Sequence, residues 1–296
     1  MDILMTGGTG LIGRAFINRY PDYRYTVLTR SAKTNAGMFP ASVQTIDSLS
    51  ALTDLDKFDA VINLAGEPIL DKRWTDRQKD VICQSRWQIT QQLVELFTHS
   101  THPPLVFLSG SAIGVYGNRG DAILSESATV QENDFPTTVC LNWETIARQA
   151  QAHTQVVLLR TGIVLDPRGG ALNKMLLPFK LGLGGRIGTG RQYMSWIHYQ
   201  DQVDAMNFLL HERGVAGAVN LVAPGAVTNQ EFTRCLARSL HRPALLPVPA
   251  LALKQLLGES SCLLLDSQRV QPQQLEANGF QFAFGELPGA LVDLLN

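Results

Sequence analysis

The chain has 296 residues, of which 45% are hydrophobic and 17% are charged, a balance typical of a well-packed globular protein. Its formal net charge is −1, so it has no overall field that would attract nucleic acid or an anionic membrane. The four cysteines and six histidines lack the spacing of a zinc site, which predicts reduced thiols and no metal centre.

The N-terminus, MDILMTGGTG, has an acid at its second position and neither a basic nor an apolar leader segment. No uninterrupted apolar run reaches the length of about 20 residues that a membrane-spanning helix needs. We therefore expect a cytoplasmic protein without a signal peptide and without membrane association.

The first half of the chain alternates between strand and helix patterns. Runs rich in apolar and aromatic residues predict strands at 2–6, 23–29, 43–46, 58–65 and 104–109 and within 155–165. Apolar residues at helical spacing predict helices at 11–20, 76–99 and 139–150. Near-continuous apolar strands separated by helices are typical of a parallel sheet covered on both faces. The sequence therefore predicts an α/β fold with a Rossmann-type, doubly wound parallel sheet.

The composition changes after Leu165, where a stretch rich in glycine and loops begins. Helical patterns follow at 200–211, 228–240, 249–257 and 286–295. We place a domain boundary near 165, with a Rossmann domain at 1–165 and a smaller, substrate-side α+β region at 166–296. A strand at 218–222 is expected to join the main sheet from the second region.

Three glycines lie in the stretch TGGTGLIG, between the first predicted strand and the first predicted helix: Gly7, Gly10 and Gly13. In a dinucleotide fold such glycines make the tight turn, let the backbone approach a pyrophosphate and let the helix pack on the strand. The pyrophosphate lies at the helix N-terminus, where free N–H groups meet it. A glycine-rich turn without a ligand is the alternative. A P-loop fits less well, because Arg14 and Ala15 replace its Lys and Ser/Thr.

The end of the second predicted strand, LTRSAK, indicates which cofactor the loop would bind. NAD-binding proteins usually place an acid there, which pairs with the ribose 2′-hydroxyl. This sequence has no acid at that point and offers Arg30, with Lys33 nearby. A guanidinium forms charge-assisted hydrogen bonds with a 2′-phosphate, whereas an acid repels it. The sequence therefore predicts NADP rather than NAD, against the alternative that Arg30 is a solvated surface charge.

Several motifs together resemble those of the extended short-chain dehydrogenases/reductases, the NAD(P)-dependent epimerase/dehydratase superfamily. They are TGGTGLIG, NLAG at 63–66 and LSGSAIGVYG at 108–117. In the second half, GTGRQYMSWIH and QRVQPQQLEANGFQF are similar to an atypical epimerase-family subgroup with a C-terminal domain of unknown function. The resemblance covers nearly the whole chain. It implies a Rossmann-type fold with NADP bound, and it implies no particular substrate.

The resemblance also implies a set of cofactor contacts, assigned by position. The pyrophosphate would be held by Gly7, Thr9, Gly10, Leu11, Ile12 and Gly13. Thr29 and Arg30 would meet the adenosine ribose phosphate, and Leu64 and Ala65 would line the ribose through their backbone. Ile163 would approach the nicotinamide.

The same superfamily carries Tyr-x-x-x-Lys on the helix predicted here at 139–150, where the lysine lowers the pKa of the proton-transferring tyrosine. By spacing, this chain has Cys140 and Glu144 at those two places. A carboxylate disfavours ionisation of a neighbouring acid, so we expect Cys140 to be a small buried residue rather than a proton donor. Glu144 is expected to be either a ribose contact or a helix-surface charge. Arg86 replaces a superfamily asparagine; it could reach the cofactor or an anionic substrate, or be a helix-surface charge.

With the usual pair absent, a proton would have to come from another group. Ser109, Ser111 and Tyr116 follow the fifth predicted strand, at the carboxyl edge where such sheets bind ligands. We take Ser111 and Tyr116 as the catalytic candidates. Tyr193 and His198 could close over the pocket from the second region. As an alternative, Tyr116 and His198 could be packed in the interior with one polar atom satisfied.

Two hypotheses for the function follow. The first is an NADP-dependent oxidoreductase or epimerase that acts on an unknown small-molecule substrate with a non-standard proton donor. The second is a non-catalytic NADP-binding sensor or partner-binding protein. The missing Tyr/Lys pair favours the second, whereas the glycine-hinged stretch GLGGRIGTGRQYMSW is typical of a substrate lid and favours the first. Extended family members often form homodimers through two helices, here about 76–99 and 138–153, and their polar content leaves a homodimer open.

Overall fold

The computed structural model describes residues 1–29, 39–40 and 42–295. In this part of the chain a seven-stranded sheet has the strand order β11-β7-β5-β4-β1-β2-β3, and every neighbouring pair is parallel. The strands are β1 (Asp2–Thr6), β2 (Arg24–Leu28), β3 (Gln44–Ile46), β4 (Ala60–Asn63), β5 (Val106–Ala112), β7 (Gln155–Thr161) and β11 (Gly217–Leu221). The order reverses between β1 and β4, so the sheet is doubly wound and the predicted fold class is confirmed.

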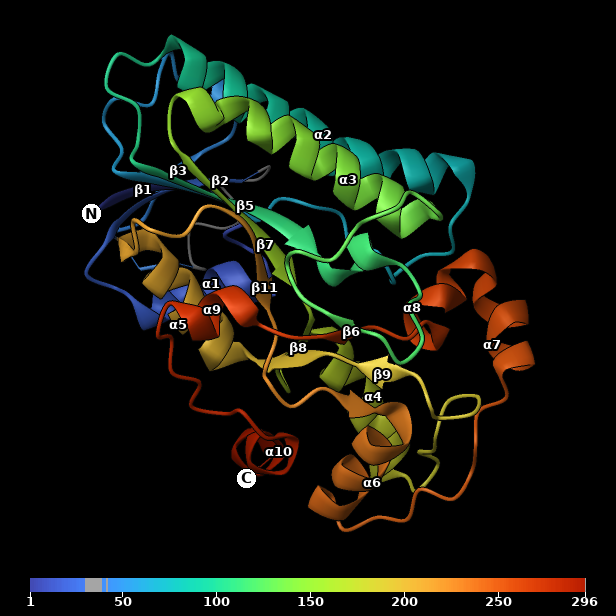
Figure 1. The fold of residues 1–296 in the computed structure, drawn as a ribbon. Helices are drawn as coiled ribbons and strands as arrows, with labels where there is room; N and C mark the ends of the chain where they lie inside the picture. Colours follow the sequence, from blue (N-terminus) through green and yellow to red (C-terminus); the bar gives the residue numbers. More distant parts are fainter. Residues whose placement is uncertain (30–38, 41, 296) are drawn as a thin grey trace.

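Helices cover both faces of this sheet, as Figure 1 shows. On one face α2 (Asp76–His99) and α3 (Phe135–Arg148) lie side by side. The other face is covered by α1 (Leu11–Arg19), α5 (Tyr199–His211) and the short α9 (Gln273–Ala277). Right-handed crossovers that run in opposite directions from the centre of the sheet place helices on opposite faces in this way.

Alternation of side chains along each strand builds two hydrophobic cores. Along β1, Ile3 and Met5 point to the α1 and α5 face, where they pack with Phe16 and Met206. Leu4, between them, points to the opposite face and belongs to the core shared with α2 and α3. Since both faces of the central strands β1, β4, β5 and β7 are buried, these strands are nearly continuous apolar runs.

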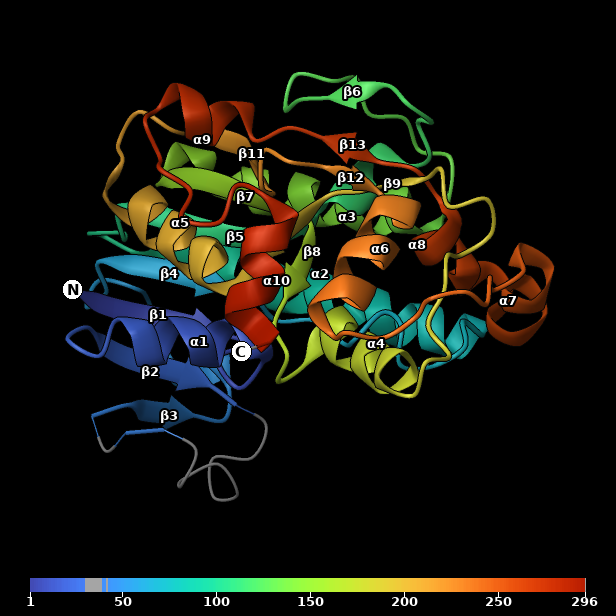
Figure 2. The ribbon, with the colours of Figure 1, turned by 90° about the horizontal axis from the view of Figure 1, so that it is seen from below.

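The C-terminal region packs on the carboxyl edge of the sheet (Figure 2). Its helices are α4 (Gly170–Lys180), α6 (Asn229–Ser239), α7 (Ala250–Leu257), α8 (Cys262–Leu265) and α10 (Leu287–Leu295). Three two-stranded sheets join it to the first part of the chain or lie within it: β8 (Ile163–Leu165) with β10 (Trp196–His198), β13 (Arg269–Val270) with β6 (Ile123–Leu124), and β9 (Tyr193–Met194) with β12 (Val227–Thr228). Trp196, Phe232 and Leu291 are central in a separate core.

Short 3₁₀ turns complete the described structure: η1 (Leu49–Ala51), η2 (Ile113–Tyr116), η3 (Gln149–Ala152) and η4 (Gly258–Ser261). The run at 155–165 is interrupted at Gly162, where a Cβ would lie 2.7 Å from the Ser195 carbonyl oxygen. The chain therefore leaves the main sheet after β7, while β11 returns to it from the second region as predicted. The boundary near 165 stays a prediction. Within the described residues, none of the helices combines the length and apolar character needed to cross a membrane.

Candidate functional site

The glycine loop joins β1 to α1 through backbone contacts that leave no room for side chains. Gly7 has a left-handed φ of +69°, and a Cβ there would collide with the carbonyl of Leu64. A Cβ on Gly13 would lie 2.6 Å from the Cα of Gly8. Gly10 is exposed at the N-cap of α1 and supplies no side-chain cap. The first N–H groups of α1 are thus left for a ligand, which fits the pyrophosphate of a dinucleotide.

A buried hydrogen-bond network holds Leu64 and Ala65 against this loop. The Thr6 hydroxyl donates to Asn63 Oδ1 at 2.6 Å, and Asn63 Nδ2 donates to Thr90 Oγ1 at 2.8 Å. The Ala65 N–H donates to Thr6 Oγ1 at 3.3 Å. These bonds fix the carboxyl ends of β1 and β4, from which the two proposed ribose contacts follow.

The proposed 2′-phosphate contacts lie after β2. Thr29 is buried, and its backbone N–H donates to the Ile46 carbonyl at 2.9 Å. Arg30 and Lys33 lie outside the described residues. The predicted preference for NADP over NAD is therefore supported at this position by the sequence alone.

The remaining residues proposed for the cofactor lie where α1 meets the C-terminal region. A Cβ on Gly169 would lie 3.1 Å from Leu11 Cδ1, so the start of α4 contacts the glycine loop. Ile12 is half-buried against the α1 and α5 core, and Ile163 is half-buried against the C-terminal core. Thr9 is half-buried within the loop itself. The site proposed for the cofactor thus lies between the sheet and the C-terminal region.

Arg86 is half-buried on α2, and its guanidinium holds the loop that follows β4. Its Nη1 donates to the Ile82 carbonyl at 2.9 Å, and its Nη2 donates to the Glu67 carbonyl at 3.0 Å. The guanidinium carbon lies 5.4 Å from the centre of the Trp143 ring. Burial lowers the pKa of Arg86. The alternative of a helix-surface charge is therefore wrong, while a contact to the cofactor or an anionic substrate stays a prediction.

Three polar residues stand side by side near the carboxyl ends of β5, β7 and β11. The strand register pairs Ser111 with Arg160, and Arg160 with Asn220. Residues paired across parallel strands point to the same face, which here is the face covered by α3. Arg160 was not predicted from the sequence, and it is the residue around which the predicted candidates gather.

Glu144 is the main partner of Arg160. Its carboxylate accepts from Arg160 Nε at 2.8 Å and from Arg160 Nη2 at 2.9 Å, a bidentate pair. The Ser111 hydroxyl also donates to Glu144 Oε1, at 2.8 Å. Glu144 is only 3% exposed, so the alternative of a helix-surface charge is wrong. A carboxylate has about four acceptor sites, and the bonds to Arg160 and Ser111 use three of them, so a ribose contact stays a prediction.

Tyr116 lies on the other side of the guanidinium. Arg160 Nη1 donates to the Tyr116 hydroxyl at 3.0 Å, and this hydroxyl donates to Asn220 Oδ1 at 2.7 Å. Tyr116 is 1% exposed, and burial raises its pKa. This is the packed arrangement that the sequence left open as the alternative to a catalytic role.

Cys140 is buried one helical turn from Glu144, beneath η2. Burial raises the pKa of the Cys140 thiol to about 12, and the negative charge of Glu144 adds to the effect. A thiol with such a pKa stays protonated at neutral pH and is a poor proton donor. Cys140 is thus the small buried residue that the sequence predicted.

The other candidates are buried away from one another. Ser109 is fully buried on β5, and its hydroxyl has no hydrogen-bond partner among the described residues. His198 is fully buried, stacked on Phe284 at 3.9 Å, and burial lowers its pKa. Its Nε2 lies 3.2 Å from an Asp293 carboxylate oxygen. Tyr193 is half-buried under the guanidinium of Arg269, at 4.8 Å.

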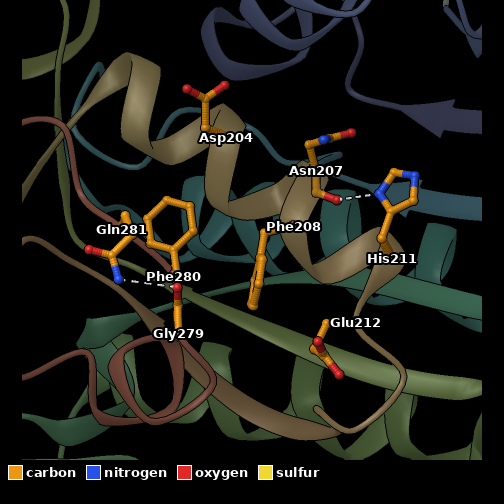
Figure 3. A pocket seen from close by; sticks show the side chains of 8 residues that line it. All are labelled: Asp204, Asn207, Phe208, His211, Glu212, Gly279, Phe280 and Gln281. Carbon is orange, nitrogen blue, oxygen red and sulfur yellow. Dashed lines mark hydrogen bonds between the residues drawn. The ribbon is translucent and has the colours of Figure 1, made fainter.

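An open pocket of about 410 Å³ lies at the opposite edge of the sheet (Figure 3). Its lining residues come from α5, from Glu212 directly after that helix, and from residues 279–281. The Glu212 carbonyl at this pocket accepts a hydrogen bond from Gln155, the first residue of β7. The pocket therefore lies at the amino ends of the strands, far from the glycine loop, and it is not the candidate site.

The sequence contains one signal that could have revealed Arg160. It is a single charged residue within the apolar run QVVLLRTGIVL. A charge in a strand buried on both faces requires a partner, because an unpaired buried charge is very costly. The natural candidate for the partner of Arg160 was Glu144, the acid at the position where the family has its lysine.

Comparison with known proteins agrees with this architecture. Residues 3–222 match the NAD dependent epimerase/dehydratase family, and residues 248–294 match a domain of unknown function, DUF1731. The chain is similar to epimerase family protein SAR0825 of Staphylococcus aureus (strain MRSA252), with 38% identity over 99% of this chain and 98% of that protein. It is also similar to epimerase family protein SDR39U1 of Mus musculus, with 36% identity over the full length of both.

Solved structures show the same relationship. The crystal structure of human epimerase family protein SDR39U1 (isoform 2) with NADPH has a TM-score of 0.92 and 34% identity, and the match covers 100% of this chain and 99% of that one. A UDP-glucuronic acid 4-epimerase of Bacillus cereus, with a TM-score of 0.80 and 17% identity over 100% and 99% of the two chains, shares the fold. The match over residues 3–222 and the full-length identities show that this chain belongs to the NAD dependent epimerase/dehydratase family.

Proposed function

We propose that this protein binds NADP(H) at the glycine loop and acts as an NADP-dependent oxidoreductase or epimerase on a small-molecule substrate. The observation that carries the proposal is the uncapped N-terminus of α1, framed by glycines at which a Cβ would meet backbone. The human relative, 34% identical along the whole chain, was crystallised with NADPH, which supports the same cofactor here. When bound, NADP(H) would supply or accept a hydride.

We expect the protein to bind NADPH more tightly than NADH, because Arg30 stands where an NAD-binding protein has an acid. Arg30→Ala should weaken NADPH binding by about 1.5–3 kcal/mol and leave NADH binding almost unchanged. Fluorescence titration of both cofactors against both proteins measures this. Equal affinities in the native protein, or an unchanged preference in the variant, would assign Arg30 to the solvated surface.

Ser111 is the better supported of the two catalytic candidates. Its hydroxyl lies at the carboxyl end of β5 and donates to the Glu144 carboxylate, which can take up a proton, whereas Tyr116 donates to the Asn220 amide, which cannot. We expect Ser111→Ala to lower NADPH-linked turnover by about 10²–10⁴-fold, the usual scale for loss of a proton-transfer group. Cys140→Ala, one turn from Glu144, should stay within a few-fold of the native protein.

The activity assay first needs a substrate, which a panel of ketones, quinones and nucleotide sugars screened for NADPH oxidation would supply. The reverse pattern, with a large loss of turnover in Cys140→Ala and intact NADPH binding, would show that Cys140 is the proton donor in place of the family's tyrosine. Tyr116→Phe tests the second catalytic candidate in the same activity assay.

A non-catalytic NADP-binding protein is the second candidate function. The Glu144–Arg160 pair favours it, because a buried ion pair fills the position from which family members present their lysine. Under this hypothesis NADPH binds with the predicted preference, and no member of the substrate panel is reduced or epimerised.

A further inference from the structure

The C-terminal region carries a surface of exposed leucines that the cofactor site does not explain. We call it the leucine patch, and it consists of Leu181, Leu183, Leu245, Leu246, Leu251 and Leu256. Each of these side chains is more than half exposed, and Leu245 reaches 82%. Large apolar side chains gathered on a surface usually mark an interaction site.

Backbone contacts bring the segments of the leucine patch together. Arg242 Nε donates to the carbonyl of Lys180 at 3.1 Å, and the Val248 N–H donates to the carbonyl of Arg186 at 2.9 Å. The Gly188 N–H donates back to the Val248 carbonyl at 2.8 Å. The turn after α4 and the segment before α7 therefore lie side by side, with a leucine pair on each.

Helix α7 extends the patch outward. Its sequence is ALALKQLL, and none of its eight residues is buried. In Figures 1 and 2 the helix projects at the edge of the molecule, away from the main sheet. Since a short helix is marginal without tertiary packing, an apolar helix this exposed indicates a further surface to pack against.

The two segments that carry the leucine patch contain only positive charges, although Asp266 lies near Lys254. Residues 175–200 and 232–258 contain seven Lys and Arg residues and no Asp or Glu. Because the whole chain has a net charge of −1, removing these seven positive charges leaves −8 on the rest. The nearly neutral total thus conceals two cationic segments, so the exclusion of anionic surfaces from net charge does not apply to them.

We propose that the leucine patch docks the protein on the surface of an anionic lipid bilayer. Leucines on turns and on a short helix can enter the interface between headgroups and acyl chains, while Lys180, Arg242 and Lys254 meet anionic headgroups. A second copy of the chain fits less well, because self-association would bring the cationic segments of two copies together. The docking is independent of the proposed cofactor function.

The position of α4 gives this docking a consequence for the active site. The helix begins at Gly170, beside Leu11 of the glycine loop, and ends at Lys180, beside the leucine patch. Its eleven residues span about 16 Å. A docked protein would therefore hold its glycine loop near the bilayer, and if the proposed function is right, the substrate class is a lipid-soluble carbonyl or alcohol.

Co-sedimentation of the full chain with vesicles tests the proposal. Phosphatidylcholine vesicles with and without a large fraction of phosphatidylglycerol would be compared at low and high salt. We expect binding to the anionic vesicles, at least about ten-fold weaker binding to the neutral ones, and weakening by salt. Absence of binding to anionic vesicles at low salt overturns the proposal.

Variants locate the binding surface. Leu245→Glu/Leu251→Glu should reduce vesicle binding at least about ten-fold, and so should Lys180→Glu/Lys254→Glu. The matched control Leu105→Glu/Ile123→Glu changes two exposed apolar residues outside the patch and should bind as the native chain does. Circular dichroism checks folding without reference to NADPH. Equal binding by patch and control variants, or a dimer in solution that the patch variants dissociate without any vesicle binding, overturns the proposal.

Discussion

Glu144→Ala should lower the free energy of unfolding by about 3–5 kcal/mol, because it leaves the Arg160 guanidinium buried without its counter-ion. The side chains of both residues are almost fully buried, so water cannot replace the lost carboxylate. In the native protein burial lowers the pKa of Arg160, but the hydrogen bonds and charge of Glu144 outweigh this effect and raise it. The variant loses that support, and because a guanidinium stays protonated in proteins, its charge is left without a counter-ion. Urea denaturation of the native and variant proteins measures the difference.

Two further variants separate the ion pair from a general effect on α3. Arg148→Ala removes a charge from the same helix, but Arg148 is 41% exposed and 3.7 Å from Glu144, so about 0–1 kcal/mol is expected. Replacing both members, as in Glu144→Leu/Arg160→Met, should regain much of the stability lost in Glu144→Ala, because no unpaired charge remains. A loss below about 1 kcal/mol in Glu144→Ala would contradict a paired, buried arginine.

The sequence predicted the elements that periodicity and local caps define. The helix predicted at 76–99 is α2, whose first turn is capped by the Thr75 hydroxyl accepting from the Gln78 N–H. The strand predicted at 218–222 is β11, at the edge of the main sheet. These elements follow from residues near one another in the chain, where spacing is informative. The glycine loop was visible for the same reason, since strand, glycines and helix are contiguous.

The buried network around Arg160 could not be read in the same way. Glu144 lies 16 residues before Arg160, and Asn220 lies 104 residues after Tyr116, so they meet only through the strand register and the packing of α3 and η2 on the sheet. The family's Tyr-x-x-x-Lys spacing identified Glu144 as unusual, but it did not show that the acid serves an arginine. A single chain gives no measure of which distant polar residues meet, and the alternatives for Glu144 had to stay open.

Gly10 is the position in the glycine loop at which a side chain should block the cofactor without disturbing the fold. Gly10→Val should weaken NADPH binding by at least about 100-fold, corresponding to roughly 3 kcal/mol, and leave the fold intact. Gly10 has φ −73° and ψ 175°, which any residue adopts, and a Cβ there meets only the Gly7 carbonyl oxygen, at 3.1 Å. Its remaining surroundings are open to solvent, where the pyrophosphate would approach the N-terminus of α1. Fluorescence titration with NADPH gives the affinity.

Valine substitutions at two other glycines distinguish an effect on cofactor binding from an effect on folding. Gly13→Val is expected to destabilise the protein as well as abolish binding, because its Cβ would press on backbone atoms of Gly7 and Gly8 at 2.6–2.7 Å. Gly289→Val, where a Cβ meets nothing within 4 Å, is the matched control and should bind NADPH normally. If Gly10→Val is folded by circular dichroism and still binds NADPH with native affinity, the cofactor does not lie on the first turn of α1. The cofactor proposal would then lose the observation that carries it.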